Sequence, residues 1–128
     1  MPRGRHEPKG TGFNPIAALA GADVLVTSSP DVEEFHWSAE YQVIVLGHDL
    51  GATERRCALA KAMACRELGY DKWVSVPRYR KVMALAAVWL IPLGDLRDAM
   101  EDLCDMPDLA ARLNVTVEVL AIRMWLGL

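Results

Sequence analysis

A lysine and a cysteine occupy two positions at which a helix can hold a metal ion. Lys61 and Cys65 are four residues apart in the stretch 54–70, ERRCALAKAMACRELGY, which is predicted to be helical. Side chains at this spacing share one helix face, so two histidines placed there can bind one zinc ion, with a glutamate between them as general base. Ala62 stands where that glutamate would be. We therefore expect no catalytic residue, no metal and no cofactor at this helix.

Two other chemistries would need side chains from outside this helix face. A relocated metal site could combine Cys65 with His48 and Glu67. A cysteine enzyme could use Cys65 as nucleophile, with its pKa lowered by Lys61 and with His36 or His48 as base. Nothing in the spacing brings these groups together. A hydrolase with a relocated site is therefore an alternative, and a buried structural cysteine is the favoured interpretation.

The residues before the central helix predict a small sheet. Three short segments rich in β-branched and aromatic side chains are separated by turn residues, at 23–27, 35–38 and 41–46. The short links between them favour a small antiparallel sheet. Residues 1–12 combine proline, glycine and charge, so we expect a disordered basic arm, followed by a single domain over residues 13–128.

The rest of the chain predicts a helical array. The central helix is expected from about Thr53 to Leu68, with Thr53 as its N-cap and Gly69 as its C-terminal stop. A second helix should end before Pro92 and is apolar on nearly all sides, so we expect it to be buried. Shorter amphipathic segments continue to Leu126. A small sheet followed by helices predicts an α+β fold.

Basic charge is concentrated in the middle of a chain whose net charge is −3. Residues 13–53 contain six acidic side chains and no lysine or arginine, whereas residues 54–81 contain eight basic side chains against three acidic ones. This imbalance favours a surface that receives an acidic partner or an anion.

Cysteine usage and hydropathy predict a cytoplasmic protein. The chain has three cysteines, an odd number that argues against a disulfide framework and for a reducing compartment. The longest apolar run, residues 82–93, is too short to span a bilayer. We therefore expect no membrane segment.

Motifs in three parts of the chain resemble the ImmA/IrrE family of metallopeptidases. The central helix matches the lead-in of the family pattern Arg-Arg-x-x-Leu-Ala-His-Glu-x-x-His at Arg55, Arg56, Leu59 and Ala60. The stretch LAAVWLIP resembles the family's Ala-Ala-x-x-Leu-Ile/Met-Pro, and DLAARLNVTVEVLAIRMWL resembles its closing segment. The resemblance covers roughly residues 20–128 and implies a zincin-like fold.

The resemblance also implies which residues would form the metal centre. The family's three metal ligands fall on Lys61, Cys65 and Lys81, and its general base falls on Ala62. An ammonium group has no lone pair for zinc, and alanine cannot take a proton from an attacking water. The resemblance thus implies a catalytically inactive pseudo-metallopeptidase, with a divergent zinc metalloendopeptidase as the alternative.

The partner expected from the resemblance is a protein. Active members of the family occur in bacteria, phages and mobile elements, where several act on transcriptional repressors. This implies a phage or mobile-element protein of lysogeny or immunity control that binds a repressor, or an acidic peptide segment, without cleaving it. The expected contact residues of the vacated cleft are Lys61, Ala62, Cys65, Arg78, Arg80 and Lys81.

The last two helical segments also have the spacing of a helix-turn-helix. A recognition helix needs outward-facing side chains that can read bases, and residues 117–126 offer only Arg123, opposed by Glu118. The sequence does not favour nucleic-acid binding, and a small DNA-binding regulator is the second alternative. We expect the terminal apolar cluster around Trp125 to fold back onto the core.

Overall fold

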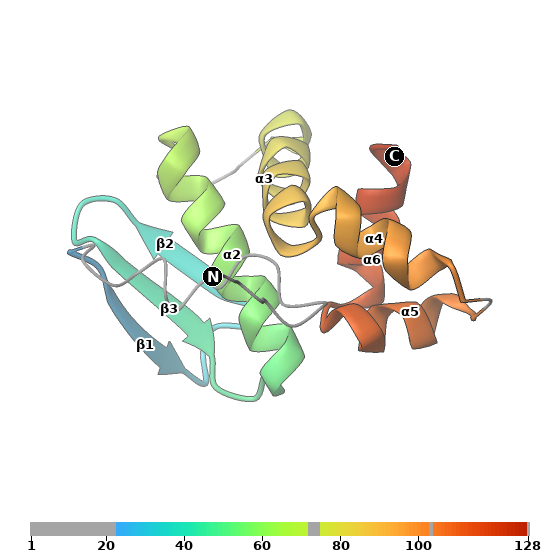
Figure 1. The fold of residues 1–128 in the computed structure, drawn as a ribbon. Coiled ribbons are helices and arrows are strands. Elements are labelled where there is room, and N and C mark those ends of the chain that lie inside the picture. Colours follow the sequence, from blue (N-terminus) through green and yellow to red (C-terminus); the bar gives the residue numbers. More distant parts are fainter. Residues whose placement is uncertain (1–22, 72–74, 103, 128) are drawn as a thin grey trace, which may run out of the picture.

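Figure 1 shows the fold in a computed structural model, which describes residues 23–71, 75–102 and 104–127. A small sheet lies at one side of the molecule and the helices extend from it towards the other side. The basic arm expected at residues 1–12 lies outside the described residues, as does the start of the expected domain.

Over the ranges that the structure describes, the sheet has three strands in the order β1-β3-β2. They are β1 (Leu25–Ser29), β2 (Phe35–Ser38) and β3 (Val43–Gly47). β2 pairs antiparallel with β3, as expected, but β1 pairs with β3 in parallel, so the prediction of a wholly antiparallel sheet is wrong. The chain reverses direction twice, which gives β3 the direction of β1, and β3 then lies between the two earlier strands.

The central position of β3 follows from its composition. Its sequence is VIVLG, and Ile44 and Leu46 are buried, whereas Leu25 of β1 is exposed. The most apolar strand gains most from neighbours on both edges and from a helix against its face. Alternation along each strand predicts the buried face, but it does not predict which strand is central.

Five helices follow the sheet in the described residues, which confirms the α+β fold class. They are α2 (Ala52–Leu68), α3 (Val76–Leu90), α4 (Leu93–Met100), α5 (Met106–Leu113) and α6 (Val117–Trp125). α2 packs on β2 and β3 with one side and on α3 with another, and α6 packs on α3. Within the described part of the chain, no helix has the length and apolarity needed to cross a membrane.

Local signals account for most helix ends. Gly69 ends α2 in the left-handed region at φ 76°, and Thr116 caps α6 by accepting a hydrogen bond from the backbone N–H of Val119 at 3.3 Å. The start of α2 differs from the prediction, because Gly51 is its N-cap. Thr53 instead donates a hydrogen bond to the side chain of Asn114 at 2.8 Å, which ties α2 to the turn between α5 and α6.

Small side chains let α2 pack closely in the centre of the domain. Residues 57–65 are all buried, and four of them are alanines. α3 buries only one face, at positions 82, 83, 86, 87 and 90, whereas Val88 is exposed. The expectation that α3 is buried therefore holds for one face of the helix from Val82 onward, and not for its first turns.

Candidate functional site

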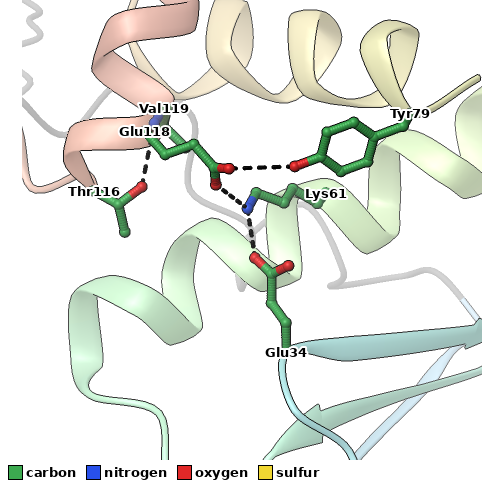
Figure 2. A network of polar contacts seen from close by, with 6 residues as sticks. All are labelled: Glu34, Lys61, Tyr79, Thr116, Glu118 and Val119. Atoms are coloured by element: carbon green, nitrogen blue, oxygen red, sulfur yellow. Dashed lines mark hydrogen bonds and ion pairs between the residues drawn. The ribbon is translucent and has the colours of Figure 1, made fainter. Parts of the chain in front are cut away.

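The charged side chain of Lys61 lies inside the domain. It is 2% exposed, and Arg123 is the other buried charged residue among those that the structure describes. Its Nζ forms ion pairs with Oε2 of Glu34 and, at 3.2 Å, with Oε1 of Glu118 (Figure 2). Figure 2 shows the lysine extending from α2 between these two carboxylates. The two partners are 27 and 57 residues away in sequence, so the site exists only in the folded chain.

A close backbone approach positions Glu34. Glu34 directly precedes β2, and its carbonyl accepts a hydrogen bond from the N–H of Gly47 at 2.9 Å. A Cβ on residue 47 would lie 2.4 Å from the carbonyl oxygen of Glu33 and 2.8 Å from that of Val32. Only glycine therefore allows the segment before β2 to lie against the end of β3, where Glu34 reaches Lys61.

The start of α6 positions Glu118. Thr116 caps the helix, and Glu118 lies in its first turn, where the helix dipole favours a negative charge. One carboxylate oxygen of Glu118 faces Lys61, and the other accepts a hydrogen bond from the Tyr79 hydroxyl of α3 at 3.3 Å. Four segments of the chain, namely the residues just before β2 and the helices α2, α3 and α6, thus meet at one polar cluster.

The cluster keeps Lys61 protonated. Burial by itself lowers the pKa of Lys61, but the hydrogen bond and charge of Glu34, with those of Glu118, outweigh it and raise the pKa above its usual value. Burial, and then the charge of Glu118, raise the pKa of Tyr79, so its hydroxyl stays a donor. Burial also raises the pKa of Cys57, although hydrogen bonding with Thr116 partly offsets this. The site therefore holds a fixed ammonium group and has no activated nucleophile among these side chains.

A pocket of about 320 Å³ opens beside this cluster. Its lining residues are Glu33, Glu34, Leu50, Glu54, Lys61, Thr116 and Glu118. Four carboxylates and a single ammonium group thus line the pocket. The expected cationic cleft is not what the structure shows at this place, because the sheet and α6 bring acidic side chains to Lys61.

The six residues predicted for the vacated cleft separate into two groups. Lys61, Ala62 and Cys65 are buried in α2, whereas Arg78, Arg80 and Lys81 are exposed on the first turns of α3. Arg78 lies over the ring of Tyr70 at 5.0 Å. From α3 it is Tyr79, not Lys81, that contacts the Lys61 cluster.

Neither predicted alternative chemistry is assembled among the described residues. Burial raises the pKa of Cys65 to about 12, so its thiol is not a nucleophile at neutral pH. His48 is exposed and contacts Asp49 at 3.3 Å, and Glu67 is also exposed. In the described ranges, no three histidine, cysteine or acidic side chains are grouped so that they could hold a metal ion.

The C-terminal helix has no arginine available to read bases. Nε of Arg123 donates to the carbonyl of Ile91 at 2.8 Å, and Nη1 donates to the carbonyl of Gly127 at 3.0 Å. This side chain is buried and joins the end of α3 to the end of α6. Trp125 is 82% exposed, so the prediction that it folds back onto the core is wrong.

Sequence reasoning missed the residues that partner Lys61. Glu34 and Tyr79 were not predicted as site residues, and Glu118 was considered only as a charge opposing Arg123. A lysine within an alanine-rich helix face signals that acidic partners must lie nearby, because an unpaired buried ammonium is very costly. That signal does not say which of the chain's acidic residues supply them.

Comparisons with known proteins support the fold and little more. No known family model matches the chain, and no curated protein matches it. A solved Mycobacterium tuberculosis transcriptional regulator is similar in structure, with a TM-score of 0.67 at 17% sequence identity. The match covers 85% of this chain and 39% of the regulator's chain. At this identity the similarity concerns the fold alone, and the matched part is less than half of that regulator.

Proposed function

We propose that this chain is a partner-binding domain of transcriptional control, with a metallopeptidase-like fold of the ImmA/IrrE type that no longer hydrolyses peptides. The observation that carries the proposal is the buried ammonium of Lys61, held by Glu34 and Glu118. By the resemblance, this residue stands at the position of a metal ligand. The ammonium group of Lys61 thus takes the place of the metal ion that an active member of the family would bind.

Loss of hydrolysis follows from the same helix. Ala62 has no group to take a proton from water, and the thiol of Cys65 is buried and protonated. The ammonium group of Lys61 has no lone pair for a metal ion, and its ion pairs already engage the carboxylates of Glu34 and Glu118.

The regulatory role is supported by one structural neighbour and by the resemblance. The neighbour is named a transcriptional regulator. The resemblance points to lysogeny or immunity control in a phage or mobile element, with a repressor as the bound protein. On this proposal the domain binds its partner and leaves it intact.

The exposed basic residues of α3 are the proposed contact for an acidic segment of that partner. Arg78, Arg80 and Lys81 lie on the first turns of this helix, where the helix dipole adds to their positive charge. Lys61 is not part of this contact, because its ammonium group is already paired with Glu34 and Glu118.

Zinc content and peptide cleavage test the loss of hydrolysis. The chain is purified without chelator, its metal content is measured, and cleavage of unstructured peptides is followed with and without added zinc. We expect substoichiometric zinc and no cleavage. Stoichiometric zinc with cleavage would instead establish the divergent metallopeptidase.

Charge reversal tests the partner contact. Candidate repressors from the same genome are assayed for binding to the chain, and Arg80→Glu with Lys81→Glu is expected to weaken binding about tenfold or more. The matched control is Arg55→Glu with Arg97→Glu, which changes the net charge equally on other exposed surfaces. Equal weakening by both variants would argue against a specific contact on α3. Tight, sequence-specific duplex binding would instead favour the DNA-binding regulator.

A further inference from the structure

The sheet has one apolar face, called here the outer face, that no helix of the described ranges covers. α2 packs on β2 and β3 against the opposite face, where Ile44 and Leu46 belong to the core, and the other described helices lie beyond α2 (Figure 1). Side chains alternate between the two faces of a strand. Val43 and Val45 therefore point away from α2, and neither of these half-buried valines is among the residues packed against the core. Leu25 of β1, the partner of Val43, is 63% exposed.

The apolar part of the outer face lies towards β1. On β2, the partners of the two valines are the polar residues Ser38 and His36. On β1, their partners are Leu25 and Thr27, whose side chains both carry methyl groups. The apolar surface thus continues from β3 onto β1 and is bordered by polar side chains along β2. A segment that enters from the side of β1 is best placed to cover it.

The chain enters β1 from an apolar segment. Residues 13–22, FNPIAALAGA, have no charged side chain, whereas residues 1–12 contain three basic side chains and one glutamate. Phe13, Ile16 and Leu19 recur every three residues, a spacing that gathers side chains on one side of a helix. The pattern therefore predicts that this segment has an apolar side to bury.

The segment is attached where it can reach the outer face. Leu19 is six residues before Leu25, and an extended chain of that length spans about 20 Å. β3 has five residues, so its length is roughly 17 Å. The side chains of Ile16 and Leu19 can thus reach any point beside the two valines. Covalent attachment also gives the segment an effective concentration of about 1 mM or more at this face, which favours it over a separate molecule.

We infer that residues 13–22 dock on the outer face of the sheet, with Ile16 and Leu19 against the two valines of β3. The sheet then lies between this segment and α2, so that apolar side chains on both of its faces are removed from water. The docked segment also covers a surface that would otherwise favour association with other molecules. The basic contact on α3 is not involved, so this inference does not rest on the proposed function.

Methyl contacts in the intact chain test the docking directly. The methyl groups of isoleucine, leucine and valine are isotope-labelled, and nuclear Overhauser effects between them are recorded in solution. We expect cross-peaks that join the methyl groups of Ile16 or Leu19 to those of Val43 or Val45. Absence of these cross-peaks would overturn the inference.

A mixed sample shows whether the contact is made within one molecule. Labelled and unlabelled chains are combined in equal amounts, and cross-peaks between the two kinds of molecule are recorded. We expect none for the outer face. Cross-peaks between molecules at Val43 or Val45 would assign this face to a second copy of the chain and overturn the assignment to residues 13–22.

Substitutions in the segment provide an independent readout. Ile16→Asn with Leu19→Asn should lower the thermal unfolding midpoint by about 5 °C or more, because the outer face loses its apolar cover. The matched control is Val88→Asn with Val117→Asn, which alters two apolar side chains exposed on α3 and α6. The control should shift the midpoint by less than about 2 °C. Equal shifts for the two variants, or an unchanged midpoint for Ile16→Asn with Leu19→Asn, would overturn the inference.

Discussion

Two clusters in this molecule set one basic side chain beside several carboxylates, and they differ in burial. Lys61 is 2% exposed and is held by Glu34 and Glu118. The side chain of Arg112 is 47% exposed and pairs with Asp102, which is 68% exposed. Both clusters lie beside a pocket with four acidic residues in its wall. Their composition is similar, so their different consequences come from access to water.

The comparison shows that burial, and not the number of ion pairs, decides what a charge does in this fold. An exposed pair replaces hydration with a contact of similar free energy, so its net contribution is small. A buried ammonium group that loses its carboxylate partners cannot be hydrated in their place, so these carboxylates are needed for folding. Four predictions test this difference.

The largest effect is expected when Lys61 loses both partners. Glu34→Gln with Glu118→Gln leaves a buried ammonium without a compensating charge, which should lower the free energy of unfolding by about 3–5 kcal/mol. Urea denaturation at neutral pH measures this change. The control is Asp102→Asn with Glu101→Gln at the exposed cluster, and a similar loss there would refute the role given to burial.

A smaller effect is expected when a methyl group is added at Gly47. The new Cβ would lie 2.4 Å from the carbonyl oxygen of Glu33, so the segment that carries Glu34 must move. Gly47→Ala should therefore cost about 1–3 kcal/mol, as overpacking usually does. Gly94→Ala is the control, because a Cβ there meets no heavy atom within 4 Å. Equal stability of the two variants would show that the close approach at residue 47 is unimportant.

The pH dependence of stability should reveal the raised pKa of Lys61. Because the pKa is higher in the folded state than its usual value of 10.5, this group stabilises the fold below that pH. The stabilisation is then lost as the pH rises through the folded-state pKa. Tyr79, Cys57 and Cys65 also have raised pKa values and act in the same direction, so the difference between variants is informative.

Lys61→Met isolates the contribution of the lysine to that dependence. The variant should lose less stability between pH 9 and pH 12 than the natural chain does. At neutral pH it should cost less than the loss of both partners, because Glu34 and Glu118 are 39% and 57% exposed and can regain water. Identical pH profiles for the two proteins would contradict the assigned pKa shift.

The smallest effect is expected at the exposed cluster. Arg112→Gln removes the ion pair with Asp102, but both side chains stay accessible to water. We expect no measurable change in the thermal unfolding midpoint. A clear loss of stability would show that exposed pairs also contribute to folding here and would weaken the comparison.

The local part of the fold was predictable from short stretches of sequence. Gly69 ends α2 and Thr116 caps α6 as predicted, since each acts on backbone groups within four residues of itself. The α+β order of elements also follows from periodicity along the chain. The expectation that β1 pairs antiparallel was wrong, because the pairing depends on which apolar strand becomes central in the folded sheet.

Residue identity and spacing within one helix are enough to place Lys61 and Cys65 four residues apart on one helix face and to show that Lys61 and Ala62 offer no lone pair for a metal ion and no general base. The role of Lys61 becomes defined only when the chain is folded. Its partners come from a segment before β2 and from α6, 27 and 57 residues away. These contacts depend on the close approach of the segment before β2 to Gly47 and on the packing of α6 against α3. Neither feature can be predicted from a local sequence pattern.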